Sequence, residues 1–145
     1  RKRVEGILSH SSGVKAHVVQ DALQSMMMRE CGIFRSKESL TRGLHAWEKL
    51  RGQTLGLHVE DKSSQFNTDL IAALEAQNLV TFSRAILSSA LARTESRGSH
   101  TRTDYPQRDD EKWLTHTLAT QAGGKVRMHY KPVVIKGYAP EARHY

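Results

Sequence analysis

Apolar residues recur every three or four positions in two stretches of the first half of the chain, and this spacing predicts amphipathic helices. The first predicted helix covers residues 15–31 and stops at Gly32, because glycine commonly ends a helix. The second starts at Ser36, a good N-cap residue, and closes at Gly52 and Gly56. Their apolar faces are formed by Val18, Val19, Ala22, Leu23, Met26 and Met27 in the first helix, and by Leu40, Leu44, Trp47 and Leu50 in the second.

A third and longer helix is predicted from Asn67, which can cap it, to about Arg93. Its apolar side chains are spread over more than one face, so we expect it to be the central helix, with neighbours packed on two sides. The polar Gln77 and Asn78 in its middle would need hydrogen-bond partners if they were buried. The predicted fold class is therefore mainly α, a three-helix bundle of the spectrin-repeat kind.

Beyond the bundle we expect an irregular C-terminal extension that contains one short helix and one short strand. Asp109 or Asp110 can cap a helix that continues to Leu118, and the glycine pair at 123–124 would break it. Alternating apolar and polar residues then predict a strand at 126–131. This strand has no obvious pairing partner in the chain.

The predicted domain organisation has three parts. Residues 1–13 are interpreted as a linker from a preceding domain that this chain lacks, residues 14–95 as the three-helix bundle, and residues 96–145 as the C-terminal extension. The first residue, Arg1, is not a methionine, and the segment after it reads like the end of a connection. We therefore expect the chain to be a fragment of a longer protein.

Composition narrows the possible classes of protein. With 145 residues, 38% of them hydrophobic and 26% charged, the chain is long enough for one globular domain with a real core. Its single cysteine, Cys31, excludes an intrachain disulfide and is expected to be a buried, inert thiol. The net charge of +7 is compatible with nucleic-acid binding, but the cations are scattered and aromatic residues are only 6% of the chain. A basic helical nucleic-acid-binding module remains an alternative.

Residues 93–113, here called the charged loop, are the most unusual part of the sequence. Their cations are Arg93, Arg97, Arg102, Arg108 and Lys112, and their carboxylates are Glu95, Asp104, Asp109, Asp110 and Glu111. Equal numbers of the two signs suit paired, bidentate contacts better than a surface of one sign. The charged loop is therefore predicted to dock against a partner.

Candidate catalytic and metal-binding residues are few. Ser96, His100 and Asp104 could be written as a triad, but three members within nine residues rarely converge, and no Gly-x-Ser-x-Gly elbow is present. His100, His116 and His129 are the one plausible metal trio, and they share no ligand spacing. The glycines form neither a dinucleotide fingerprint nor a P-loop. We assign no catalytic, cofactor-binding or metal-binding residue to the chain.

The sequence from Arg93 to His116 closely resembles the C-terminal region of the flavoprotein subunit of succinate dehydrogenase and fumarate reductase. The shared motifs are Glu-Ser-Arg-Gly-x-His, Asp-aromatic-Pro, Arg-Asp-Asp and Trp-Leu-x-His. Residues 63–68 and 130–133 add to the resemblance, which covers about residues 14–135. After Pro132 the tail departs from the family pattern.

The resemblance implies a parent subunit that binds FAD covalently, oxidises succinate to fumarate and passes electrons to an iron-sulfur subunit. In that family the flavin-binding and substrate-binding residues lie upstream of this region. FAD is therefore expected in the parent subunit and not on this chain alone, which we predict to be inactive. The expected partners are the flavin domain of the same subunit and the iron-sulfur subunit, with no nucleic acid. Contact with the membrane is expected only through anchor subunits, at the cytoplasmic, inner side of the cell membrane.

Twelve residues of the resembling segment are predicted to brace this region against the flavin domain or neighbouring subunits. They are Arg93, Glu95, Ser96, Arg97, His100, Arg102, Asp104, Arg108, Asp109, Asp110, Trp113 and His116. By the same reasoning, the unpaired strand at 126–131 would find its partner elsewhere in the subunit. L-aspartate oxidase shares Glu-Ser-Arg-Gly-x-His and is kept as an alternative, although the Arg-Asp-Asp-x-x-Trp-Leu-x-His continuation favours succinate dehydrogenase. The direction of the parent reaction is left open.

Overall fold

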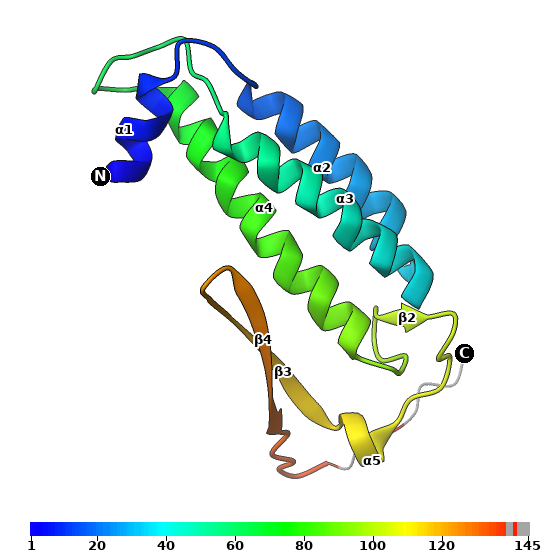
Figure 1. Cartoon of the computed structure of the whole chain (residues 1–145). Helices are drawn as coiled ribbons and strands as arrows, with labels where there is room; N and C mark the ends of the chain where they lie inside the picture. The colour runs from blue at the N-terminus through cyan, green and yellow to red at the C-terminus, as the bar shows by residue number, and fades with distance from the viewer. Residues whose placement is uncertain (139–140, 142–145) are drawn as a thin grey trace.

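Three long helices lie side by side in the computed structural model, which describes residues 1–138 and 141 (Figure 1). They are α2 (Ala16–Glu30), α3 (Lys37–Leu55) and α4 (Thr68–Ala92). Each begins and ends close to its predicted limits, and the predicted mainly α fold class is confirmed.

Both predicted N-caps are present. The Ser36 hydroxyl accepts a hydrogen bond from the Ser39 amide at 3.1 Å, and the Ser39 hydroxyl accepts one from the Ser36 amide at 3.0 Å. This reciprocal pair is a capping box, which satisfies two amides at the start of α3. At the start of α4, the side-chain carbonyl of Asn67 accepts from the Leu70 amide at 2.7 Å. Local sequence therefore determines where these two helices begin.

Helix α4 is the central element, as predicted. It contacts α1, α2, α3 and both strands of the C-terminal hairpin. Its buried residues are Ala73, Ala76, Val80, Ser83, Leu87 and Ala90. By length and composition alone α4 could cross a membrane, but here it packs against the other two bundle helices. Trp47 of α3 is 2% exposed and donates its indole N–H to the Val80 carbonyl.

The predicted linker contains a helix. Helix α1 (Lys2–Ser9) buries Ile7, and Arg3 donates hydrogen bonds to the Leu74 carbonyl at 2.7 Å and to the Gln77 side chain. The segment is thus packed against α4, which the sequence analysis did not foresee. A helix of two turns with one buried residue is too short to show a clear apolar period. That a domain precedes this segment stays a prediction.

The extension contains a β-hairpin where we expected a longer helix and an unpaired strand. Helix α5 (Asp110–Trp113) is a single turn. It is followed by β3 (Thr115–Ala122) and β4 (Lys125–Pro132), which pair antiparallel. Gly123 and Gly124 both have positive φ, so they form the tight turn between the strands. The helix prediction through Leu118 and the prediction of a strand partner elsewhere are both wrong.

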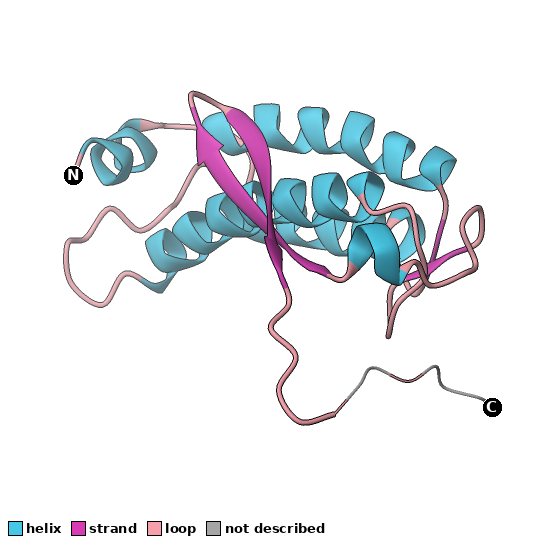
Figure 2. Ribbon diagram, turned by 90° about the horizontal axis from the view of Figure 1, so that it is seen from below, coloured by secondary structure: helices cyan, strands magenta, loops and turns pink. Residues whose placement is uncertain are grey.

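The hairpin lies beside α4 and crosses the bundle in the second view (Figures 1 and 2). Most of its residues are exposed on both faces. Alternate threonines in β3 favour the extended backbone, because branching at Cβ restricts side-chain freedom in a helix. Such a two-stranded sheet is only marginally stable by itself, so its anchoring to α4 matters.

Candidate functional site

The charged loop folds over the end of the bundle where α3 begins and α4 ends. Two short strands, β1 (Phe34–Arg35) and β2 (Thr101–Arg102), pair in parallel and attach the loop to the connection between α2 and α3. The Thr103 amide donates to the Arg35 carbonyl at 2.8 Å. A left-handed Gly98, with φ +59°, allows the turn in which Arg97 and His100 exchange backbone hydrogen bonds.

Arg102 joins the two helix ends. It is 1% exposed, and its guanidinium donates to both carboxylate oxygens of Asp104, at 2.7 and 2.8 Å. Its third nitrogen donates to the carbonyls of Ala90, Leu91 and Arg93, which lie at the end of α4. Asp104 in turn accepts from the Lys37 amide in the first turn of α3 at 2.8 Å. Arg102 thus binds unpaired carbonyls at the C-terminus of α4, and Asp104 binds an unpaired amide at the N-terminus of α3.

Glu95 is the second buried charge and is fully enclosed. Its carboxylate accepts two hydrogen bonds from Arg97, at 2.8 and 2.9 Å, one from Arg93 and one from the Asp109 amide at 2.9 Å. Burial alone would raise the pKa of Glu95. The hydrogen bonds from Arg97, the Asp109 amide and Arg93 outweigh it, so the pKa of this carboxyl lies below its ordinary value.

These contacts change how the charged loop is interpreted. Glu95 and Arg102 have no surface that a partner could touch, so any part they play in docking is through the shape of the loop. Arg97, Arg108 and Asp110 are partly exposed and are linked by ion pairs, with Arg108 and Asp110 2.7 Å apart. The balanced charges therefore first neutralise one another within the chain.

The remaining predicted interface residues lie around this network. The Asp109 carboxylate caps α5 by accepting from the Lys112 amide at 3.0 Å. The Trp113 indole donates to the Thr94 hydroxyl at 3.1 Å, and its ring lies against the Arg93 guanidinium, 5.0 Å from the ring centroid. His116 is exposed on β3. The structure brings Trp113 to the base of the hairpin and leaves His116 outside the network.

Ser96, His100 and Asp104 do not form a triad. The Ser96 hydroxyl accepts from the Arg102 amide and donates to the Tyr105 carbonyl, both at 2.8 Å. Asp104 is held by Arg102, which lowers the pKa of its carboxyl well below the usual range. Among the described residues, no group of three or more His, Cys, Asp or Glu side chains is placed to hold a metal ion. Burial raises the pKa of the Cys31 thiol, in agreement with an inert role.

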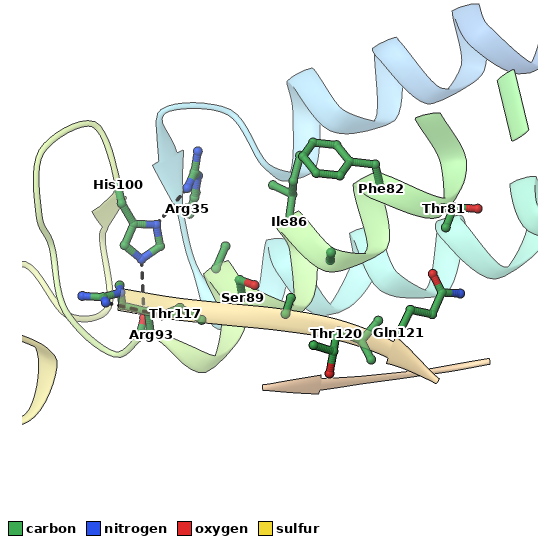
Figure 3. A pocket seen from close by; sticks show the side chains of 14 residues that line it. Arg35, Thr81, Phe82, Ile86, Ser89, Arg93, His100, Thr117, Thr120 and Gln121 are labelled. Atoms are coloured by element: carbon green, nitrogen blue, oxygen red, sulfur yellow. Dashed lines mark hydrogen bonds between the residues drawn. The ribbon is translucent and has the colours of Figure 1, made fainter. Parts of the chain in front are cut away.

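A groove of about 620 Å³ opens between α4 and β3 (Figure 3). Phe82 and Ile86 form part of its α4 wall, and Arg35, Arg93 and His100 lie at one end. The Arg35 guanidinium contacts Nδ1 of His100 at 2.8 Å. Because arginine can only donate, this nitrogen accepts, which requires a neutral imidazole. Burial and the neighbouring arginines hold the pKa of His100 below its ordinary value.

Sequence reasoning missed Arg35 as a site residue. It belongs to the connection between the first two bundle helices, and 65 positions separate it from His100. A single arginine in a turn carries no pattern that marks it. Only the pairing of β1 with β2 brings it to the charged loop.

Residues 20–145 match the family described as the fumarate reductase flavoprotein C-terminal region. The chain belongs to this family. It is 37% identical over 138 residues to the succinate dehydrogenase flavoprotein subunit of Rickettsia bellii, a match that covers 94% of this chain and 23% of that protein. It is 36% identical over 146 residues to the fumarate reductase flavoprotein subunit of Mycobacterium tuberculosis, which covers 99% of this chain and 25% of that protein.

The fold agrees with the sequence matches. A quinol fumarate reductase FrdA structure from E. coli superimposes with a TM-score of 0.89 at 30% identity, over 97% of this chain and 25% of that one. The chain thus spans about a quarter of the length of these relatives. The family resemblance seen in the charged loop is confirmed for nearly the whole chain.

Proposed function

We propose that this chain is the C-terminal helical domain of a flavoprotein subunit that interconverts succinate and fumarate and transfers electrons to an iron-sulfur subunit. The close match in fold to a quinol fumarate reductase over almost the full chain supports this proposal most directly. The domain packs on the flavin domain of the same subunit. Its task is to support the flavin domain and the assembly of the complex.

The residues described here do not fit FAD. A dinucleotide site needs a strand, a glycine-rich turn and a helix, and the paired strands of residues 1–138 are two-residue pieces and a hairpin. We therefore assign FAD to the part of the parent subunit upstream of this domain. We assign no step of electron transfer to the residues of this chain.

The exposed members of the charged loop are assigned to the interface with the flavin domain. The buried ion pairs of Glu95 and Arg102 hold the loop in one conformation. The exposed side chains of Arg97, Arg108 and Asp110 are linked by ion pairs, so docking costs them little further conformational entropy. A quinol is a membrane-dissolved electron carrier, and a relative is named as a quinol fumarate reductase. This supports a parent complex attached to the membrane, and our proposal places it on the cytoplasmic side, held through anchor subunits.

The decisive experiment uses the intact parent subunit. We expect bound flavin, dye reduction with succinate and fumarate reduction with a reduced viologen. Activity on aspartate together with none on succinate or fumarate would replace this function by an aspartate oxidase. Salt-sensitive binding to DNA or RNA by a subunit without flavin would replace it by the nucleic-acid-binding alternative.

The interface assignment is tested by Arg97→Ala in the same subunit. Loss of this guanidinium breaks contacts with Glu95 and Asp110, so we expect a lower flavin content and a lower melting temperature. Lys49→Ala, a change at an exposed residue of α3, is the control. Unchanged flavin content and melting temperature in Arg97→Ala would contradict the assignment.

A further inference from the structure

Arg35 is a cation without a carboxylate partner among the described residues. Arg93, Arg97 and Arg102 each form an ion pair inside the charged loop. The contacts of Arg35 are to neutral groups: Nε donates to the Gly32 carbonyl at 2.6 Å, and one terminal nitrogen donates to His100 at 2.8 Å. None of the described carboxylates therefore compensates its charge at the end of the groove.

Two more residues lie at the same end of the groove, and neither adds an unpaired charge: Arg93 is paired with Glu95, and His100 is neutral. Arg93 lines it, and the neutral His100 is held between the Arg35 guanidinium and the Arg93 carbonyl (Figure 3). In the part of the chain that the structure describes, no aspartate or glutamate lines the groove. A carboxylate placed here would gain charge-assisted hydrogen bonds from a guanidinium that is already oriented.

The rest of the groove is lined by apolar side chains of α4 and of the hairpin together with polar ones such as Thr81, Ser89 and Thr120. Phe82 lines the groove and is 64% exposed, and Leu79, which lines a neighbouring groove, is 48% exposed, although both belong to the central helix. A second groove of about 380 Å³, between α2 and α4, shares the side chains of Phe82 and Ile86 with the first. From Leu79 to Ala90 the helix rises roughly 16 Å, the length of about five extended residues. Exposed apolar tracks of this kind mark interaction sites.

Hydrogen bonds at its base and at its tip hold the hairpin across the groove. At its base, Arg93 donates to the carbonyls of Trp113, at 2.9 Å, and Thr115. At its tip, Arg84 of α4 donates to the Gly124 carbonyl. With both ends tied to α4, the strands span the groove, and none of the described residues fills it.

We propose that the groove receives an extended segment of the flavin domain of the parent subunit. An aspartate or glutamate of that segment lies against Arg35 and His100, and apolar side chains cover Phe82 and Leu79. This inference rests on the proposed function, which places the flavin domain in the same polypeptide and therefore at a high effective concentration. The carboxylate supplies the charge that the positive end of the groove lacks.

The first test is oxidative footprinting of Phe82 in the intact flavoprotein subunit, purified without other subunits. With the groove empty, the observed exposure of Phe82 would slow its oxidation less than about twofold relative to the urea-unfolded subunit. With the groove filled, we expect slowing of about tenfold, as for a residue in an interface core. A slowing below twofold overturns the proposal.

The second test isolates the carboxylate. Arg35→Met in the intact subunit should raise Phe82 oxidation by about threefold or more, and Arg35→Lys, which keeps the charge, should restore part of the protection. Lys49→Met removes one charge from α3, which lines neither groove, and should leave Phe82 protected. Equal protection in all three variants overturns the assignment of a carboxylate to Arg35.

The outcomes separate this inference from the proposed function. A subunit with flavin and succinate activity but a freely oxidised Phe82 refutes the inference and leaves the function in place. A subunit with neither succinate nor fumarate activity refutes the function, and with it the flavin domain as occupant. Protection that appears only on adding the iron-sulfur subunit, or only at high protein concentration, assigns the groove to another subunit or a second copy and also refutes the inference.

Discussion

Replacing Arg102 by methionine should strongly destabilise this domain. Methionine keeps much of the side-chain volume but removes five hydrogen bonds, two to the Asp104 carboxylate and three to carbonyls at the end of α4. Breaking a buried ion pair by removing one partner costs about 3–5 kcal/mol, because the other charge is left uncompensated. The Asp104 side chain is 30% exposed, so water relieves part of this penalty and about 3 kcal/mol is expected.

Urea unfolding of the 145-residue chain, followed by circular dichroism, measures this change in the free energy of unfolding. Asp104→Asn alone should cost about 2–4 kcal/mol, because it leaves the buried Arg102 without its carboxylate, although the side-chain oxygen can still accept from the Lys37 amide. If the pair acts as a unit, the double variant should be less destabilised than the sum of the single variants by about 1–3 kcal/mol.

The exposed Arg127→Met is the control, and we expect a change within about 0.5 kcal/mol. A loss below about 1 kcal/mol for Arg102→Met, or strict additivity in the double variant, would refute the reasoning that this buried pair holds the two helix ends together.

Three further predictions concern the core, the second buried charge and pH. Gly43→Ala should destabilise the domain by about 1–3 kcal/mol, because the new Cβ would lie 2.8 Å from a Leu87 methyl. In Gly52→Ala, in the same helix, the new Cβ meets no atom within 4 Å, so this change should stabilise the domain by about 0.5–1 kcal/mol. Thermal melts of both variants check these expectations. Glu95→Gln should cost about 2–4 kcal/mol in urea unfolding, as it removes the carboxylate that pairs with Arg93 and leaves Arg97 with Asp110 alone, and a neutral result would contradict the buried network. Because folding lowers the pKa values of Glu95 and Asp104, their stabilisation is complete above the ordinary values of 4.5 and 3.8 and is lost as pH falls through the lower folded values. Urea midpoints should therefore drop between about pH 5 and pH 2, and a midpoint independent of pH in that range would be inconsistent with these shifts.

The parts of the fold that were predicted correctly depend on neighbouring residues. Ser36 and Asn67 cap the helices that follow them, and the apolar period along each helix marks the face that packs. The hairpin was missed because an aspartate cap and an apolar run suggested a helix through Leu118. The branched residues of β3 and the turn at Gly123 and Gly124 were the signal that should have outweighed it.

The candidate site was predicted only in part. Its motif identified the charged loop, but equal numbers of cations and carboxylates could not show which charges pair within the chain. The full burial of Glu95 and Arg102 depends on how the loop turns back over two helix ends. Arg35 and the apolar side chains of the groove come from other elements, and their proximity to His100 is a property of the packed chain.

The sequence by itself determined three helices, the N-caps of two of them, the absence of a dinucleotide fingerprint and the family, because each of these depends on residues close together along the chain. The tertiary structure decided which charges pair within the domain, where the hairpin is attached to α4, and that Arg35, at the end of an open groove, has no carboxylate partner among the described residues. Those features depend on contacts between distant residues, where burial makes an unpaired charge costly and so determines which partners must meet.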